Sequence, residues 1–424
     1  MNGLNETKAL IDFIKRSPSP FHVVSNMKKG LIESGFHELK EDERYKIEKG
    51  GKYFVTRNGS ALIAFVIPTK EAKGYSIVSA HTDSPTFKLK NNPEVTSSNF
   101  YTVLNVEKYG GMLIAPWFDI PLSIAGRVFI SNAGKIEERL ISFDEDLVSI
   151  PNLAIHLNRK ANEGVEHKVQ KELLPLFAMG CEKGRFLHLI ASKLGVKEED
   201  ILDSDLFLYN RMEPSIWGLD KAFFSSPKID DLGCAFSAYE AIKESVGKDY
   251  ISMIALFDNE EVGSGTGQGA LSDLLSSTLS RIAYSLSYDE EKRYMMKKES
   301  FMLSADNGHA LHPNYTEVSD PINRPTLNGG ILIKYSANQK YTTDGESGAF
   351  VRSLCKEADV PYQVFLNNSD VLGGSTLGNL STQKVSIKTA DIGIAQLAMH
   401  SPYECAGCED TARLEKLFKT FLSR

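Results

Sequence analysis

Apolar runs typical of β-strands recur along this chain, and acidic or histidine side chains follow them. Four runs carry this pattern, at 75–80, 251–257, 301–305 and 389–394. The polar residues at or beyond their ends include His81, Asp83, Glu260, Glu261, Asp306, Asp391 and His400. In open α/β sheets, ligands bind beyond the carboxyl ends of the strands. The sequence therefore predicts that these polar clusters converge on one site.

The order of patterns along the chain predicts an interrupted domain. A length of 424 residues favours about two or three domains. Asn58-Gly59 lies between two apolar runs, which is a hairpin signal, and strand–helix alternation resumes from Asp230. Short β-rich pieces fill the middle. We predict an α/β, mixed-sheet domain formed by residues 1–92 and 219–424, with an inserted β-rich domain at 93–218.

Composition excludes several classes of protein. Hydrophobic residues at 42% and charged residues at 24% are typical of a soluble globular protein with a large core. The net charge of -7 argues against a nucleic-acid partner, because binding to phosphates depends on clustered Lys and Arg. No basic leader and no apolar run of about 18 residues is present, so we expect no membrane contact and a cytoplasmic location.

Three other patterns are weak. Cys405-Ala-Gly-Cys408 lacks the second pair of ligands that a structural zinc site needs, and five cysteines are too few for a disulfide framework. His309 and His312 lack the Glu of an H-E-x-x-H motif. The glycine-rich stretch 263–269 lacks the Gly-Lys-Ser/Thr of a phosphate loop. None of them points to the main chemistry.

The strand-end residues suit a metal site. His81, Glu261, Asp306 and His400 supply two imidazoles and two carboxylates, which suit zinc, cobalt or manganese. A second cation requires one more carboxylate as a bridge, and Asp230, in a loop that leads into a helix, could supply it. Two cations about 3.5–4 Å apart clamp a carbonyl and lower the pKa of a shared water. The expected chemistry is hydrolysis.

Two further acidic residues have expected roles beside the ligands. Adjacent residues beyond a strand end can point in different directions, so Glu261 would bind metal while Glu260 acts as general base and acid. Asp83 lies two residues after His81 and could accept the other N–H of that imidazole. Each residue also has a plainer interpretation: Asp230 as a helix cap, Asp83 as part of a turn, and the two Glu residues as a solvated loop.

The motifs together resemble a known family. They are His81-Thr-Asp-Ser-Pro, Lys228-Ile-Asp-Asp-Leu, Asp258-Asn-Glu-Glu-Val-Gly-Ser264, Ala305-Asp306 with His312-Pro-Asn-Tyr315, Leu327-Asn-Gly-Gly-Ile-Leu-Ile-Lys334 and Met399-His400-Ser401. In order and spacing, from about Thr7 to the C-terminus, they are similar to the signature set of the M18 aminopeptidases, the aspartyl aminopeptidase family.

The resemblance implies a complete enzyme. One zinc would be held by His81, Asp306 and a bridging Asp230, and the other by Glu261, His400 and the same Asp230. Asp83 would orient His81, and Glu260 would be the general base. The substrates would be peptides, and the chain would form a homo-oligomer, a dodecamer, whose inserted domain makes dimer contacts. His156 occupies the place of an insert histidine that reaches a neighbouring active site; a buried histidine without catalytic duty is the alternative.

Specificity rests on Lys334. In acid-preferring members, a lysine in the matching stretch pairs with the carboxylate of an N-terminal Asp or Glu residue, and Lys334 stands there at the end of an apolar run. An internal salt bridge is the alternative role. Asp231 stands where many relatives have Asn, and the stretch 338–344 is similar to members of broader or leucine-type preference. Both departures put the acidic preference in doubt.

Three functional classes remain to be weighed. The first is an exopeptidase that removes one N-terminal residue. The second is a related dimetal deblocking peptidase or deacylase, which would act on blocked amines. The third is a non-enzymatic assembly protein on a degenerate scaffold, which the presence of all five ligands and the base argues against.

Overall fold

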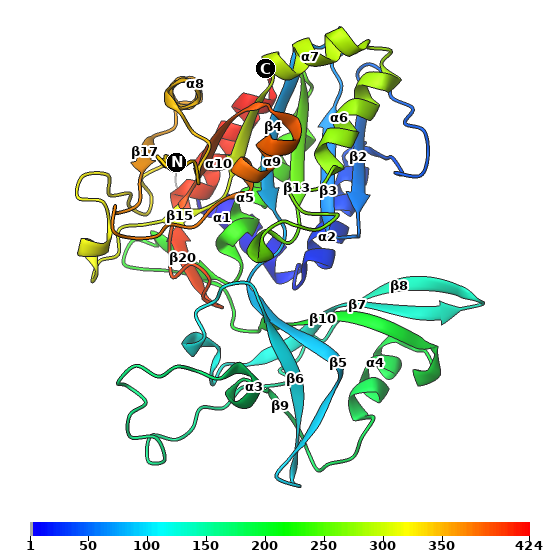
Figure 1. Cartoon of the computed structure of the whole chain (residues 1–424), viewed down its shortest axis with the longest axis vertical. Helices are drawn as coiled ribbons and strands as arrows, with labels where there is room; N and C mark the ends of the chain where they lie inside the picture. The colour runs from blue at the N-terminus through cyan, green and yellow to red at the C-terminus, as the bar shows by residue number, and fades with distance from the viewer. Residues whose placement is uncertain (1–2) are drawn as a thin grey trace. The chain divides into compact units, whose positions relative to one another are not determined.

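The computed structural model describes residues 3–424, which form two compact units (Figure 1). The first contains residues 3–83, Pro214–Met399 and Glu404–Arg424, and the second contains Ser84–Glu213 and His400–Tyr403. The first unit ends at Asp83 and resumes at Pro214, so both boundaries lie earlier in the sequence than the predicted ones at residues 92 and 219. The reason is that β5 (Thr86–Ser97) is one continuous strand, which pairs with strands of the second unit over its length.

A nine-stranded mixed sheet forms the centre of the first unit, in the order β1-β2-β3-β13-β4-β14-β18-β16-β17. Its strands are β1 (His37–Glu38), β2 (Lys52–Arg57), β3 (Ala61–Val66), β4 (Gly74–His81), β13 (Tyr250–Phe257), β14 (Phe301–Ala305), β16 (Ile331–Lys334), β17 (Tyr362–Phe365) and β18 (Lys388–Gly393). The neighbours β13, β4, β14 and β18 are parallel. The four apolar runs of the sequence therefore end at one edge of the sheet, as predicted.

Helices cover both faces of this sheet, because its central strands are apolar on both sides. Along β13, Ile254 and Leu256 enter one hydrophobic core, and Met253, Ala255 and Phe257 enter the other. The first core also takes residues from α1 (Leu4–Lys15), α2 (Pro20–Glu33), α5 (Ile229–Glu244), α8 (Gly345–Glu357) and α10 (Cys408–Leu422). The second takes residues from α6 (Leu274–Ser285), α7 (Glu290–Glu299) and α9 (Leu377–Val385). Continuous apolar strands are typical of sheets buried in this way.

Local signals of the sequence account for several of these elements. Asn58 and Gly59 both have positive φ, 54° and 65°, and join β2 to β3 as the dipeptide predicts. A smaller sheet completes the unit, in the order β11-β12-β20-β19-β15. Its strands are β11 (Ser215–Trp217), β12 (Phe223–Ser226), β15 (Gly308–His309), β19 (Ala395–Leu397) and β20 (Glu404–Gly407). Short helical turns occur at η3 (Glu260–Val262) and η4 (Thr316–Val318).

The second unit is a separate antiparallel sheet with its own core, in the order β8-β7-β10-β5-β6-β9. Besides β5 it contains β6 (Tyr101–Tyr109), β7 (Leu122–Asn132), β8 (Lys135–Ser142), β9 (Leu176–Met179), β10 (Ile201–Asn210), α3 (Val169–Glu172), α4 (Arg185–Leu194), η1 (Ala115–Trp117) and η2 (Glu198–Asp200). Residues 151–168 carry no helix or strand. Across residues 3–424, no helix combines the length and apolar character needed to cross a membrane.

Candidate metal centre

His81 is the last residue of β4, and its side chain is 1% exposed. Its Nδ1 lies 3.3 Å from an oxygen of the Asp83 carboxylate, and its Nε2 lies 3.6 Å from Oδ1 of Asp230. Burial by itself lowers the pKa of His81, but the hydrogen bonds to Asp230 and Asp83 outweigh it and raise that pKa well above the usual value. The imidazole is therefore oriented from one side, with its other nitrogen directed at a second carboxylate.

Asp230 and Asp306 reach the same place from different elements. Asp230 lies in the first turn of α5, with non-helical backbone angles (φ -83°, ψ 111°). Asp306 follows directly after β14. Both residues are buried, with exposures of 3% and 7%. Ligand atoms of His81, Asp230 and Asp306 all lie within 4.8 Å of one another, which is compact enough for a single cation. The N-cap of α5 is Lys228, so Asp230 does not occupy the cap position, and its role as a metal ligand stays a prediction.

Glu260 and Glu261 share the turn η3 beyond β13, and Asp83 holds that turn in place. The main-chain N–H groups of Glu260 and Glu261 donate to the two oxygens of Asp83, at 3.1 and 3.2 Å. Potential ligand atoms of His81, Glu260 and Glu261 also lie within 4.8 Å of one another. One buried carboxylate thus orients both the imidazole and the pair of Glu residues.

Burial raises the pKa values of several acids here, and neighbouring negative charges raise them further. The pKa of Asp306 rises to about 6, that of Asp258 to about 7 and that of Glu260 to about 8. The pKa of Glu261 is also raised well above its usual value, by burial and by the charge of Asp230. A divalent cation would relieve this repulsion, so the donor set fits a metal.

Lys334 is buried and forms its hydrogen bonds within the protein. Its ammonium is 2% exposed and donates to the main-chain carbonyls of Asp306 and Asn307, both at 2.9 Å. It lies 3.8 Å from an oxygen of the Asp306 carboxylate and 5.0 Å from the centre of the Tyr341 ring. An ammonium has three N–H donors, and two of them are directed at main-chain oxygens here.

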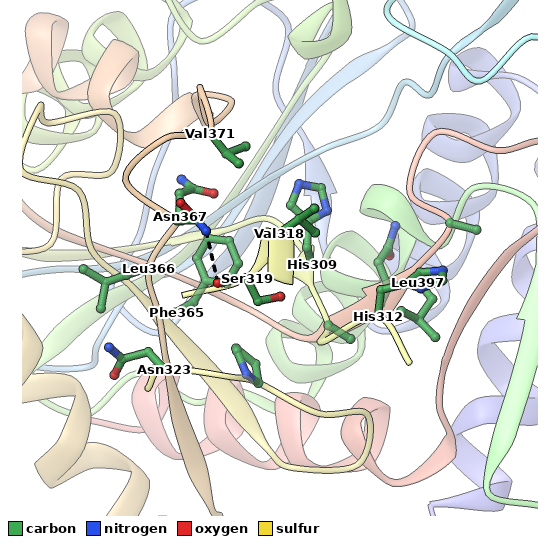
Figure 2. Close-up of a pocket in the computed structure, with 15 residues that line it drawn as sticks. His309, His312, Val318, Ser319, Asn323, Phe365, Leu366, Asn367, Val371 and Leu397 are labelled. Atoms are coloured by element: carbon green, nitrogen blue, oxygen red, sulfur yellow. Dashed lines mark hydrogen bonds between the residues drawn. The ribbon is translucent and has the colours of Figure 1, made fainter. Parts of the chain in front are cut away.

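A cavity of about 250 Å³ opens beside β15 and β19 (Figure 2). The residues that line it, which contain no Asp, Glu, Lys or Arg, are His309, Ala310, His312, Val318, Ser319, Asn323, Pro325, Phe365, Leu366, Asn367, Asn368, Val371, Gln396, Leu397 and Ala398. His309 and His312 therefore belong to a cavity wall, and neither belongs to a potential ligand group among residues 3–424.

Two predicted site residues belong to the second unit. His400 begins the short segment His400–Tyr403, where its carbonyl accepts a hydrogen bond from the Leu113 N–H at 3.1 Å. His156 is exposed and lies in 151–168, which has no regular structure. The roles of both residues, as metal ligand and as substrate contact, stay predictions.

Three buried polar residues near the proposed ligands were not predicted from the sequence: Asn307, Gln396 and Glu404. Glu404 accepts a hydrogen bond from the main-chain N–H of Asp230 at 3.0 Å. Its only sequence signal is its place four residues after His400. Asp391 lies within the fourth strand run, and its carboxylate accepts hydrogen bonds from Thr342 and Thr376.

Comparison with known proteins assigns the family. The sequence matches the profile of the family described as "Aminopeptidase I zinc metalloprotease (M18)" over residues 13–422. The chain belongs to the M18 family. It is an M18 aminopeptidase of enzyme class EC 3.4.11.-. It is 45% identical to a "Probable M18 family aminopeptidase 2" of Clostridium acetobutylicum, with 99% of each chain covered. A protein of the same name from Pseudomonas aeruginosa is 39% identical over 98% of this chain and 97% of its own.

Solved M18 structures share the fold over nearly the whole chain. Ape4, in a complex with Nbr1, superposes with a TM-score of 0.95 at 34% identity, covering 99% of this chain and 86% of that one. An M18 aminopeptidase of Thermotoga maritima gives 0.85 at 26% identity, covering 98% and 95%. The Saccharomyces cerevisiae mApe1 dodecamer gives 0.86 at 28% identity, covering 98% and 95%. The mixed sheet and the separate antiparallel sheet are thus features shared with M18 aminopeptidases.

Proposed function

We propose that this M18 aminopeptidase uses two divalent cations to release the N-terminal residue of peptides. His81, Asp306 and a bridging Asp230 hold one cation, and Glu261, His400 and Asp230 hold the other. Zinc suits this set of imidazoles and carboxylates, and cobalt or manganese are the alternatives. His400 directly follows Met399, the last residue of a first-unit segment.

The chemistry divides between the cations and Glu260. When bound, the two cations polarise the scissile carbonyl and lower the pKa of a water. Glu260 accepts the proton of that water and later donates it to the leaving amine. Its pKa of about 8 without metal results from burial and from nearby carboxylates, and positive charge beside it would lower that pKa and favour the basic form.

One observation carries the proposal. The carboxylate of Asp83 lies against the imidazole ring of His81. The same carboxylate accepts hydrogen bonds from the main-chain N–H groups of Glu260 and Glu261. A solvated loop would not have both of its N–H groups bound by a carboxylate that is 1% exposed. The paired Glu residues are therefore held toward His81, as a ligand and a base beside one cation would need to be.

Replacing Glu260 with Gln tests the base. We expect kcat to fall about 10²–10⁴-fold, because the amide cannot accept the proton, while the metal content stays unchanged. The matched control is Glu357→Gln on the exposed end of α8, which should keep full activity. A fully active Glu260→Gln enzyme would remove Glu260 from the mechanism.

The same assay separates this function from its alternatives. An aminopeptidase hydrolyses an aminoacyl anilide with a free amine and leaves the N-acetylated form intact. Faster turnover of the acetylated form would favour a deblocking peptidase or deacylase. No hydrolysis of either anilide, with or without chelator, together with no bound metal, would favour an assembly protein.

The preferred N-terminal residue depends on Lys334. An acidic preference requires its ammonium to bind the side-chain carboxylate of the substrate. The two hydrogen bonds that this ammonium donates to main-chain carbonyls support the alternative of a broad or leucine-type preference. Anilides of Asp, Glu, Leu and Lys decide between the two: a wide margin for Asp over Leu would restore Lys334 as the substrate contact.

We also propose a homo-oligomer, by analogy with the dodecameric mApe1. In this assembly the inserted domain would make dimer contacts, and His156 would reach the substrate of a neighbouring subunit. The exposure of His156 is consistent with such a contact. A light-scattering mass equal to one chain of 47.0 kDa would rule the assembly out.

A further inference from the structure

Glu404 contacts the backbone of Asp230, a proposed metal ligand, but is not itself a proposed ligand. It is the first residue of β20 and is 2% exposed. Its Oε2 accepts from the Asp230 N–H at 3.0 Å, and its Oε1 accepts from the side-chain amide of Gln396 at 3.2 Å. The backbone angles of Asp230 lie outside the helical range, and Glu404 supplies the acceptor for its N–H.

Asn307 closes this set of bonds into a ring. Its Nδ2 donates to Oε1 of Gln396 and to the carbonyl of Ile229, both at 2.9 Å. Ile229 directly precedes Asp230, and Asn307 directly follows Asp306. Hydrogen bonds of Glu404, Gln396 and Asn307 therefore connect the backbone at Asp230, one proposed ligand, to the residue that follows Asp306, another proposed ligand.

The hydrogen bonds in the ring diverge from the donor Asn307 and converge on the acceptor Glu404. The carbonyl of Ile229 can only accept, so the amide nitrogen of Asn307 must face it. The oxygen of Gln396 then faces Asn307, and its nitrogen faces Glu404. Glu404 thus receives donors on both oxygens, from Gln396 and from Asp230. A side chain that carries an amide N–H at position 404 would direct that N–H at one of these two donors, and that hydrogen bond would be lost.

We propose that Glu404, Gln396 and Asn307 form a hydrogen-bonded frame that fixes the separation of Asp230 and Asp306 before a cation binds. Glu404 is the positioning residue, because it alone accepts from both sides. The inference rests on the proposed metal site. A bridging carboxylate must reach two cations at once, so a small displacement of its backbone weakens both interactions. Ordinary satisfaction of buried polar groups would also produce these bonds, and the experiment separates that explanation.

The experiment measures the affinity of the purified full chain for Zn²⁺ by competition with a chromophoric chelator, without substrate. Glu404→Gln places an N–H against either the Asp230 N–H or the Gln396 amide, and we expect Zn²⁺ affinity to fall about 10–100-fold. The matched control Glu409→Gln changes a partly exposed neighbour on α10, outside the ring, and should leave the affinity unchanged.

A double variant restores the ring. With Glu404→Gln and Gln396→Glu together, residue 396 accepts from Asn307 and from residue 404, and residue 404 accepts from the Asp230 N–H. We expect most of the lost Zn²⁺ affinity to return. Recovery would not follow if Glu404 acted only through its local charge.

Three outcomes would overturn the frame. The first is Glu404→Gln with wild-type Zn²⁺ affinity, even if the metal-free protein melts at a lower temperature, because the ring would then serve stability alone. The second is a double variant no better than the single one. The third is a chain that binds no Zn²⁺, Co²⁺ or Mn²⁺ at all, which would remove the proposed function as well. The first two leave the aminopeptidase proposal intact.

Discussion

At the scale of single residues, Asp83 has more contacts than its place after His81 suggests. It orients the imidazole and binds two consecutive N–H groups of the Glu260–Glu261 turn. Asp83→Asn keeps the size of the side chain but directs an N–H at one of those donors and removes the charge beside His81. We expect kcat to fall about 10–100-fold, with some loss of bound zinc, measured by steady-state kinetics and metal analysis. Unchanged kinetics would show that the turn holds itself.

At the scale of elements, the positions of the proposed ligands depend on how firmly their strands are packed in the core. Leu303 on β14 is fully buried, three residues before Asp306. Leu303→Ala should lower the free energy of unfolding by about 2–5 kcal/mol, since it leaves a cavity in the first core. Leu372→Ala, at a side chain that is 95% exposed, is the matched control and should change it by less than about 0.5 kcal/mol. Urea unfolding of both metal-free variants checks this, and equal midpoints would contradict it.

At the scale of the whole molecule, the buried acids link stability to pH and metal. The folded-state pKa values of Asp306, Asp258 and Glu260 rise to about 6, 7 and 8, mainly through burial. Between the usual carboxyl range and these values the folded chain binds more protons than the unfolded chain, so its stability falls as pH rises. We expect the Tm of the metal-free protein to drop from pH 5 to pH 8, and the gain in Tm from added zinc to grow. A gain that is constant over this interval would contradict the linkage.

Much of the fold could be predicted because its signals are local. The parallel strands β4, β13, β14 and β18 follow from apolar runs, and their shared edge follows from how parallel strands are connected. The β2–β3 hairpin follows from Asn58 and Gly59, which adopt positive φ at low cost. Such signals depend on backbone preferences over a few residues, which a single sequence displays directly.

The sequence by itself determined the fold class, the family and the set of candidate ligands, because strand patterns and motif spacing are visible in the order of residues. The tertiary structure alone decided which buried polar groups meet. Glu404 and Asp230 are 174 positions apart, and Lys334 and Asp306 are 28 apart, yet each pair is joined by a hydrogen bond. No local preference encodes such partners. Packing of the core brings them together, and the cost of leaving a buried polar group unbonded then selects the pairing.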